Sequence, residues 1–332
     1  MCSQATVIVT YNVQKKKLEM LLNISTRLPR YIYADSVRLK QILVNLLSNA
    51  SKFTEKGEIE LKIEPLHKDG DFTTIRFGVR DTGIGIKKEK QKKIFEAFSQ
   101  EDGSTTKKYG GTGLGLTISN RLLGLMGSNL QLESTPGVGS YFYFDVTFRA
   151  EEGDPIQWEH IDNVKTVLVV DDNTNNRIIV TQMLLLKNIK TTEARNGLEA
   201  LQLLADGQQF DVILMDYHMP YMDGIETIRK IRANFPGDDE EQPIILLYSS
   251  SDDDKIMAAC DELRVCQKLV KPVKMQEIYH ALSRISKIEE SIPRAVADEP
   301  APQESALTVL IVEDNEVNML LTHTIIGRNF PH

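Results

Sequence analysis

The sequence is poor in the residues that build disulfide frameworks and zinc sites. Only three cysteines occur in 332 residues, and none of them forms a Cys-x-x-Cys pair, which argues against a disulfide-stabilised fold or a zinc ribbon. No apolar run is long enough to cross a bilayer, and the N-terminus lacks the apolar core of a signal peptide. We therefore expect a cytoplasmic chain without a membrane segment, with any anchor of the full-length protein lying upstream.

Basic residues are also in the minority. Lys and Arg number 39 against 47 Asp and Glu, and the net charge is −8. A nucleic-acid partner is therefore not expected. The apolar fraction of 41% is close to that of globular proteins, and 332 residues suffice for two ordinary domains and a remainder.

Changes of pattern divide the chain into five segments. Residues 1–149 end in a strand-like stretch, and an acidic linker containing Gly and Pro follows over residues 150–164. Residues 165–288 alternate short apolar strands with amphipathic helices, and residues 289–306 are an acidic, Pro-rich linker. Residues 307–332 repeat the beginning of the third segment, so we expect the truncated start of a second copy.

The third segment is predicted to be a doubly wound α/β domain. Its short apolar runs are typical of parallel strands that are buried on both faces. In such a sheet the functional groups lie at the carboxyl ends of the strands. The predicted strands are Val167–Val170, Val212–Met215, Ile244–Leu247 and Leu269–Val270.

A helix predicted over residues 35–54, with Asp35 or Ser36 as its N-cap, places three polar side chains on one face. Asn45, Asn49 and Lys52 are spaced four and three residues apart. An amide oxygen can complete the coordination shell of Mg²⁺, and a lysine can contact a phosphate. Taken alone, the three residues fit a solvated polar face better.

Two glycine-rich segments favour a nucleotide site. Asp81-Thr-Gly83-Ile-Gly85 follows a predicted strand. The glycines let the backbone approach a flat ring, and the carboxylate of Asp81 is able to accept a hydrogen bond from an exocyclic amine such as that of adenine. The second segment, residues 110–115, opens a helix predicted over residues 116–126 and offers free backbone N–H groups to an anion.

In this order the segments resemble the ATP-binding domain of sensor histidine kinases, whose superfamily also includes gyrase and the heat-shock ATPases. Residues 45–54 are similar to the N box, 81–86 to the G1 box and 111–116 to the G2 box. Residues 94–98, Ile-Phe-Glu-Ala-Phe, resemble the F box, which separates histidine kinases from their relatives.

The resemblance implies an α/β sandwich that binds ATP and Mg²⁺ beneath a lid formed by residues 87–110. It implies that Asn49 is a Mg²⁺ ligand, that Lys52 contacts phosphate and that Asp81 recognises adenine. The remaining nucleotide contacts that it implies are Asn45, Gly83, Gly85, Gly111, Thr112, Gly113, Leu114 and Gly115.

A carboxylate site is predicted in the third segment. Asp171 and Asp172 follow one strand, Asp216 ends another, and these strand ends converge on one crevice. Three carboxylates repel one another, so a divalent cation is expected there. An aspartate that accepts a phosphoryl group also needs a cation and a hydroxyl, roles open to Lys271 and to a serine after residue 247.

This segment resembles a response regulator receiver domain with a flavodoxin-like fold. The marks are Asp171-Asp172-Asn173, the run from Met215 to Gly224, and Lys271-Pro272, whose peptide bond is often cis in the family. The resemblance implies that Asp216 is the phosphoacceptor, that Asp171 and Asp172 hold Mg²⁺ with it, and that Lys271 contacts the phosphoryl group.

Two positions depart from the receiver pattern. The hydroxyl after the fourth strand is Ser249 when counted back from Lys271 and Tyr248 when counted on from Pro243, and we choose Ser249. Lys268 stands where an aromatic switch residue is common, which argues against aromatic switching.

None of the six histidines is followed by the acidic residue and proline that mark the phosphoacceptor histidine of the family. We therefore expect the catalytic and receiver portion of a hybrid histidine kinase, a fragment or a truncated reading frame, in a two-component phosphorelay. Its partners would be a phosphohistidine-bearing domain of the same or another protein and a histidine phosphotransfer protein. The alternatives are a non-catalytic module that binds nucleotide and accepts phosphate, and a gyrase-like ATPase, which the F box and the receiver disfavour.

Overall fold

The structure is a computed structural model that describes residues 2–95, 114–153, 158, 161–235, 242–249 and 253–290. Gly111, Thr112, Gly113, most of the expected lid and the expected second receiver start at 307–332 lie outside the described residues. Within the described ranges, no helix is both long and apolar enough to cross a membrane.

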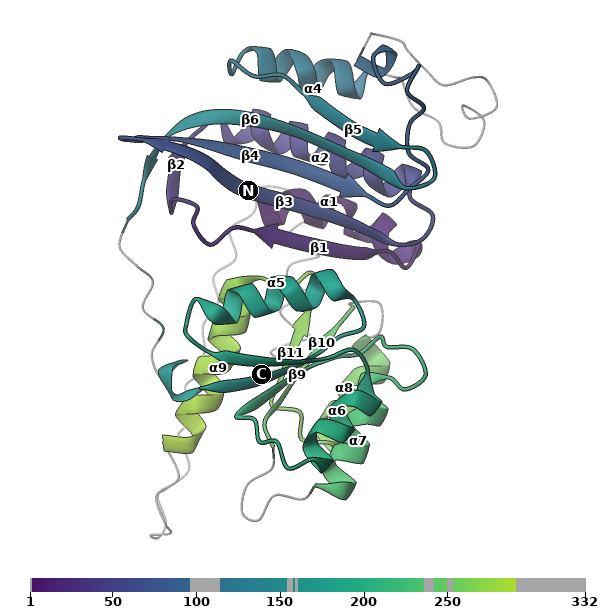
Figure 1. The fold of residues 1–332 in the computed structure, drawn as a ribbon, viewed down its shortest axis with the longest axis vertical. Coiled ribbons are helices and arrows are strands. Elements are labelled where there is room, and N and C mark those ends of the chain that lie inside the picture. Colours follow the sequence, from purple (N-terminus) through teal and green to yellow (C-terminus); the bar gives the residue numbers. More distant parts are fainter. Residues whose placement is uncertain are drawn as a thin grey trace, which may run out of the picture. The chain divides into compact units, whose positions relative to one another are not determined.

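The N-terminal half is built on a mixed sheet, ordered β1-β3-β4-β6-β2, with β5 paired to β6 (Figure 1). β1 pairs in parallel with β3, and the other pairings are antiparallel. The strands are β1 (Glu19–Ile24), β2 (Tyr31–Tyr33), β3 (Glu58–Asp69), β4 (Phe72–Asp81), β5 (Gln131–Thr135) and β6 (Gly139–Glu151).

In the described part of this half, the helices that share one apolar core with the sheet are α1 (Cys2–Lys15), α2 (Ser36–Phe53) and α4 (Gly115–Gly124). Asp35 is the N-cap of α2 and accepts a hydrogen bond from the backbone N–H of Arg38 at 3.1 Å. The buried stripe of α2 follows the predicted 3.6-residue period, because it is the face that packs on the strands. Its members are Leu39, Ile42, Leu43, Leu46, Leu47, Ala50 and Ser51.

The C-terminal half is a five-stranded parallel sheet ordered β11-β10-β9-β7-β8. Two apolar clusters cover it, one that includes residues of α5 and α9 and one that includes residues of α6, α7 and α8, so the predicted doubly wound fold is confirmed. The strands are β7 (Thr166–Val170), β8 (Lys190–Ala194), β9 (Val212–Asp216), β10 (Ile244–Tyr248) and β11 (Gln267–Val270). The helices are α5 (Thr174–Leu185), α6 (Gly197–Ala205), α7 (Gly224–Asn234), α8 (Asp253–Glu262) and α9 (Met275–Glu290).

Short 3₁₀ turns and one aromatic contact complete the described parts. The turns are Lys93–Phe95 and Ile161–Asn163. Trp158 packs against the apolar cluster that contains residues of α5 and α9, where its ring lies edge-on to that of Tyr279 with the centroids 5.7 Å apart. The single tryptophan thus packs on the C-terminal half.

Candidate functional site

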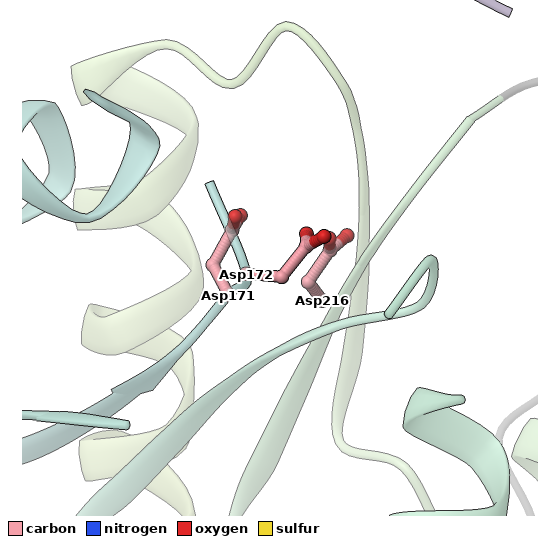
Figure 2. A group of neighbouring side chains, drawn as sticks. All are labelled: Asp171, Asp172 and Asp216. Carbon is pink, nitrogen blue, oxygen red and sulfur yellow. The ribbon is translucent and has the colours of Figure 1, made fainter. Parts of the chain in front are cut away.

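Three carboxylates meet at the carboxyl ends of two neighbouring strands. Val170 of β7 is in register with Met215 of β9, so the residues that follow, Asp171 and Asp216, are brought side by side. One oxygen of each of Asp171, Asp172 and Asp216 lies within 4.8 Å of the others (Figure 2). Asp171 and Asp216 are each only 2% exposed, whereas Asp172 is open to solvent. The convergence expected from the sequence is therefore present.

The ammonium group of Lys271 neutralises part of this charge. Its Nζ lies 3.0 Å from Asp171 Oδ2 and 2.8 Å from Asp216 Oδ1. The backbone N–H of Lys271 donates to the carbonyl of Tyr248 at 2.8 Å, and the Lys271–Pro272 peptide bond is cis. Burial alone would lower the pKa of Lys271, but the charges of Asp216, Asp171 and Glu19 outweigh it and raise the pKa, so the lysine stays protonated.

Burial dominates the acid–base behaviour of the carboxylates. It raises the pKa of Asp216 to about 8, with Lys271 opposing the shift and Asp171 adding to it. Burial likewise raises the pKa of Asp171 and of Asp172, and the charge of Glu19 adds to both shifts. Asp216 Oδ1 has no aligned hydrogen bond despite its ion pair with Lys271. A hard divalent cation fits this donor set, since carboxylate oxygens are what Mg²⁺ prefers.

A buried arginine donates hydrogen bonds to the backbone of the loop between β7 and α5. Arg177 is 5% exposed, and its Nη1 donates to the carbonyl oxygens of Asp171 at 2.8 Å and of Asp172 at 3.2 Å. Asn173 caps α5 by accepting from the N–H of Asn175, and its own N–H donates to Asp171 Oδ1 at 2.8 Å. Arg177 was not predicted from the sequence, because an arginine in the first turns of a helix is normally exposed.

The two candidate hydroxyl residues after β10 differ in their surroundings. Tyr248 is 5% exposed and belongs to the apolar cluster that includes residues of α8. Ser249 is half-buried and follows the last residue of the strand. Lys268, which replaces the common aromatic residue, lies on β11 and pairs with Asp261 at 3.5 Å.

The candidate nucleotide site lies along α2. Asn45 donates to Ser119 Oγ of α4 at 2.9 Å. A Cβ on Gly115, the first residue of α4, would lie only 2.2 Å from Asn45 Oδ1. The absence of a side chain at Gly115 therefore lets the N-terminus of α4 reach Asn45, while Leu114 is the N-cap of that helix.

Asp81 ends β4 and lies near the other end of α2. Its side chain is 7% exposed and accepts from the N–H of Gly83 at 2.8 Å. Burial raises the pKa of Asp81, and the N–H groups of Gly83 and Ser140 oppose the shift. A Cβ on Gly83 would lie 2.4 Å from the carbonyl of Phe53, the last residue of α2. Gly85 has a φ of +65°, so it too requires glycine.

The glycine segments thus reach α2 at two points. Asn45 and Phe53 are eight residues apart, or about 12 Å along a helix, and Asn49 lies midway on the half-buried polar face. Lys52 is near the Asp81 end, and burial lowers the pKa of its ammonium. Lys16, which no sequence pattern marks, donates to the carbonyls of Ser51, Lys52 and Thr54 at the end of this helix.

Two family models match the two halves of the chain. Residues 34–150 match the histidine kinase-, DNA gyrase B-, and HSP90-like ATPase, and residues 167–283 match the response regulator receiver domain. The predicted fold classes of both halves are thereby confirmed, and the ATPase family supports ATP binding.

Curated proteins similar to this chain are named as hybrid histidine kinases or sensor kinases. The chain is 34% identical over 249 residues to hybrid signal transduction histidine kinase K of Dictyostelium discoideum. This alignment covers 68% of this chain and 20% of that protein. The chain is also 38% identical over 213 residues to the autoinducer 2 sensor kinase/phosphatase LuxQ of Vibrio parahaemolyticus. This alignment covers 61% of this chain and 25% of that protein. The chain therefore spans about a quarter or less of the length of these relatives.

A solved structure aligns over both halves. The crystal structure of full-length ShkA in complex with AMPPNP covers 98% of this chain and 63% of its own, with a TM-score of 0.67 and 27% sequence identity.

Proposed function

The chain carries a histidine kinase-type ATPase domain followed by a response regulator receiver domain, the combination of hybrid histidine kinases, and we propose that it performs two steps of a phosphorelay. In the first, the ATPase domain (residues 1–149) binds ATP and Mg²⁺ and directs the γ-phosphoryl group to a histidine that this sequence does not supply. In the second, the receiver domain (residues 165–288) takes that phosphoryl group onto Asp216.

For the nucleotide, we assign roles along α2. Asn49 holds Mg²⁺, Lys52 contacts phosphate, and Asp81 accepts a hydrogen bond from the adenine amine. Asn45, Gly83, Gly85 and the segment from Gly111 to Gly115 line the site. The support is the contact of Gly115 with Asn45 at one end of this face and of Gly83 with Phe53 at the other.

For the receiver, an oxygen of Asp216 attacks the phosphorus of a phosphohistidine. A P–O bond to the carboxylate forms, the P–N bond breaks, and the imidazole leaves with the electron pair and takes a proton from water. Asp171, Asp172 and Asp216 would hold Mg²⁺, which supplies neutralising charge. Lys271 and the hydroxyl of Ser249 contact the transferred oxygens.

The observation that carries the proposal is the ion pair of Lys271 with Asp171 and Asp216 beside a third carboxylate, which is the charge arrangement that a phosphorylated aspartate needs. The partners that we propose are a phosphohistidine-bearing domain of the same or another protein and, for onward transfer, a histidine phosphotransfer protein.

The direct test uses acetyl phosphate and Mg²⁺ as a small phosphodonor, with intact-protein mass spectrometry as the readout. We expect the wild-type chain to gain one phosphoryl group that hydroxylamine removes, and Asp216→Asn to gain none. Asp206→Asn, which changes an exposed aspartate at the end of α6, is the matched control and should be labelled like the wild type.

A second experiment separates the ATPase role from the receiver role. With ATP as donor, the chain alone should bind nucleotide without forming a hydroxylamine-resistant phosphoprotein, because the acceptor histidine is supplied elsewhere. Stable phosphohistidine on this chain would contradict the proposal.

A further inference from the structure

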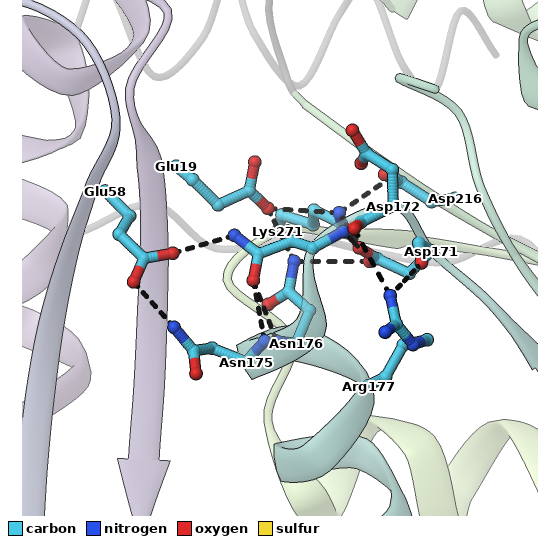
Figure 3. Close-up of polar contacts among 10 residues, drawn as sticks. Glu19, Glu58, Asp171, Asp172, Asn175, Asn176, Arg177, Asp216 and Lys271 are labelled. Atoms are coloured by element: carbon cyan, nitrogen blue, oxygen red, sulfur yellow. Dashed lines mark hydrogen bonds and ion pairs between the residues drawn. The ribbon is translucent and has the colours of Figure 1, made fainter. Parts of the chain in front are cut away.

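Lys271 has a third anionic partner that comes from the ATPase domain. Its Nζ lies 3.1 Å from Glu19 Oε1, in addition to its contacts with Asp171 and Asp216 (Figure 3). Glu19 is the first residue of β1. The same oxygen accepts a hydrogen bond from Asn176 Nδ2 at 2.6 Å. The carboxylate of Glu19 is therefore bound to Lys271, the side chain that is proposed to contact the phosphoryl group.

A second carboxylate lies beside the first. Glu58 is the register partner of Glu19 in the parallel pairing of β3 with β1. Its two oxygens accept from Asn173 Nδ2 at 2.8 Å and from Asn175 Nδ2 at 2.6 Å. Glu19 and Glu58, here called the carboxylate edge, thus face three asparagine amides at the N-terminal end of α5. The positive end of that helix dipole favours anions.

An apolar contact accompanies these polar ones. Leu21 of β1 is 1% exposed and belongs to the apolar cluster of the receiver domain, whereas its strand neighbours Met20 and Leu22 belong to the core of the ATPase domain. Ile179 and Val180 of α5 belong to the same cluster as Leu21. β1 is an edge strand whose side chains are buried on both faces, one in the core of the ATPase domain and the other in the cluster of the receiver domain. A charge pair alone would not bury Leu21 in this way.

The carboxylate edge and a phosphoryl group on Asp216 would compete for one cation. Lys271 is the side chain that the proposed function gives to the phosphoryl oxygens, and its ammonium lies within 3.1 Å of three carboxylates. Phosphorylation adds negative charge at Asp216, which attracts the ammonium and repels Glu19. The two states therefore disfavour each other.

We propose that the carboxylate edge is a docking surface of the ATPase domain for the unphosphorylated receiver domain, and that phosphorylation of Asp216 releases it. The inference rests on the proposed role of Asp216. Because the coupling of two binding equilibria is reciprocal, a phosphoryl mimic that weakens docking must itself bind more weakly to the docked receiver domain than to the undocked one.

The test compares Glu19→Gln and Glu58→Gln, which remove charge but keep side-chain size, in the full chain. Glu64→Gln is the control, since Glu64 lies on β3 and pairs with Lys62 at 2.9 Å. Docking is followed by amide hydrogen exchange of residues 19–24 and 174–180, and phosphorylation by the rate of labelling with acetyl phosphate.

In the wild type and in Glu64→Gln, the exchange of both segments should be slow and should accelerate on phosphorylation or on addition of beryllofluoride, a phosphoryl mimic. In Glu19→Gln the exchange should already be fast and labelling of Asp216 should be faster. Calorimetry should show that beryllofluoride binds this variant about tenfold more tightly, within the usual range of coupling between sites. Glu58→Gln should change both in the same direction.

The outcomes separate the two hypotheses. Labelling of Asp216 without any change in exchange overturns the docking inference alone. Absence of labelling in every variant overturns the proposed function, and the inference falls with it. Slower labelling and weaker Mg²⁺ binding in Glu19→Gln, measured by calorimetry, would show instead that Glu19 belongs to the cation site, which also overturns the inference.

Discussion

The receiver site and the ATPase site are assembled in opposite ways. In the receiver domain, the carboxyl ends of parallel strands of one sheet bring Asp171, Asp216 and Lys271 into direct ionic contact. In the ATPase domain, the candidate residues are spread along about 12 Å of one helix, and the glycine contacts fix the backbone rather than the charges. The receiver site therefore holds charged groups close together in a buried place. The ATPase site is a surface whose backbone shape is fixed and whose charged groups do not contact one another in this way.

The largest expected effect tests whether the two sites rest on separate cores. Phe144 is fully buried in the ATPase core and stacks on Phe77 with centroids 5.3 Å apart. Phe144→Ala should cost about 3–5 kcal/mol of the unfolding free energy of that domain. In urea titrations, the midpoint for loss of nucleotide-analogue binding should lie at a lower urea concentration in the variant than in the wild type. The midpoint for loss of Asp216 labelling should be the same in both.

Phe72→Ala, at a residue that is 53% exposed, is the matched control and should shift neither midpoint appreciably. Equal shifts of both midpoints in Phe144→Ala would mean that the sites share one cooperative unit.

The strain in the receiver site predicts a pH dependence. The pKa of Asp216 is about 8 in the folded chain and near 4 when unfolded, so folding favours the protonated form. Without a cation, stability should therefore fall as the pH rises through the window between these two values. At pH 8 Asp216→Asn should therefore be more stable than wild type, and at pH 4 this difference in unfolding free energy should be much smaller.

Thermal unfolding with EDTA at several pH values measures this effect. Excess Mg²⁺ should remove most of the difference at pH 8, because the cation binds only the folded wild-type site. A wild-type stability that rises from pH 5 to pH 8 in EDTA would contradict the raised pKa.

The ATPase site should lose affinity in a smaller step. Asp81→Asn replaces the proposed adenine acceptor, and we expect ATP affinity to fall about tenfold, or 1.4 kcal/mol, as for loss of one hydrogen bond to a charged group. Isothermal titration with ATP and Mg²⁺ checks this. Asp69→Asn, an exposed position on β3, should bind normally. Unchanged affinity in Asp81→Asn would remove Asp81 from the site.

The smallest effect concerns the approach of α4 to α2. Gly115→Ala forces Asn45 to move, because the added methyl would lie 2.2 Å from its Oδ1. We expect a loss of about 1 kcal/mol in ATP binding, comparable to one hydrogen bond. Gly124→Ala, at the last residue of the same helix, meets nothing within 4 Å and should leave binding intact. Equal affinities in both variants would show that the close approach is irrelevant to the nucleotide.

Local patterns in the sequence predicted most of the chemistry-bearing elements. The apolar runs at 167–170, 212–215 and 244–247 lie in strands of the parallel sheet, and Asp35 caps α2 as predicted. The helix predicted over 116–126 begins one residue earlier, at Gly115, and ends at Gly124. These features depend on periodicity and capping, which are visible in short stretches of sequence.

What the sequence could not supply is contact between distant segments. β8 contains Lys190, Thr191, Thr192 and Glu193, so it has no apolar run, and it is a strand because of its register with β7. In the sequence, Glu19 and Glu58 cannot be distinguished from ordinary surface acids. They become neighbours only because β1 pairs with β3, and they then contact asparagines at the start of α5. Their role depends on tertiary placement, which no spacing rule encodes.

The polar character of β8 has a consequence for crowded assemblies. Among the described strands it ends one side of the parallel sheet, with its outer backbone groups available for pairing, and Lys190 and Glu193 are exposed there. Charged side chains on such a border discourage a strand of a second molecule from adding to it. The charges on β8 should therefore keep the sheets of neighbouring copies from joining edge to edge at high protein concentration.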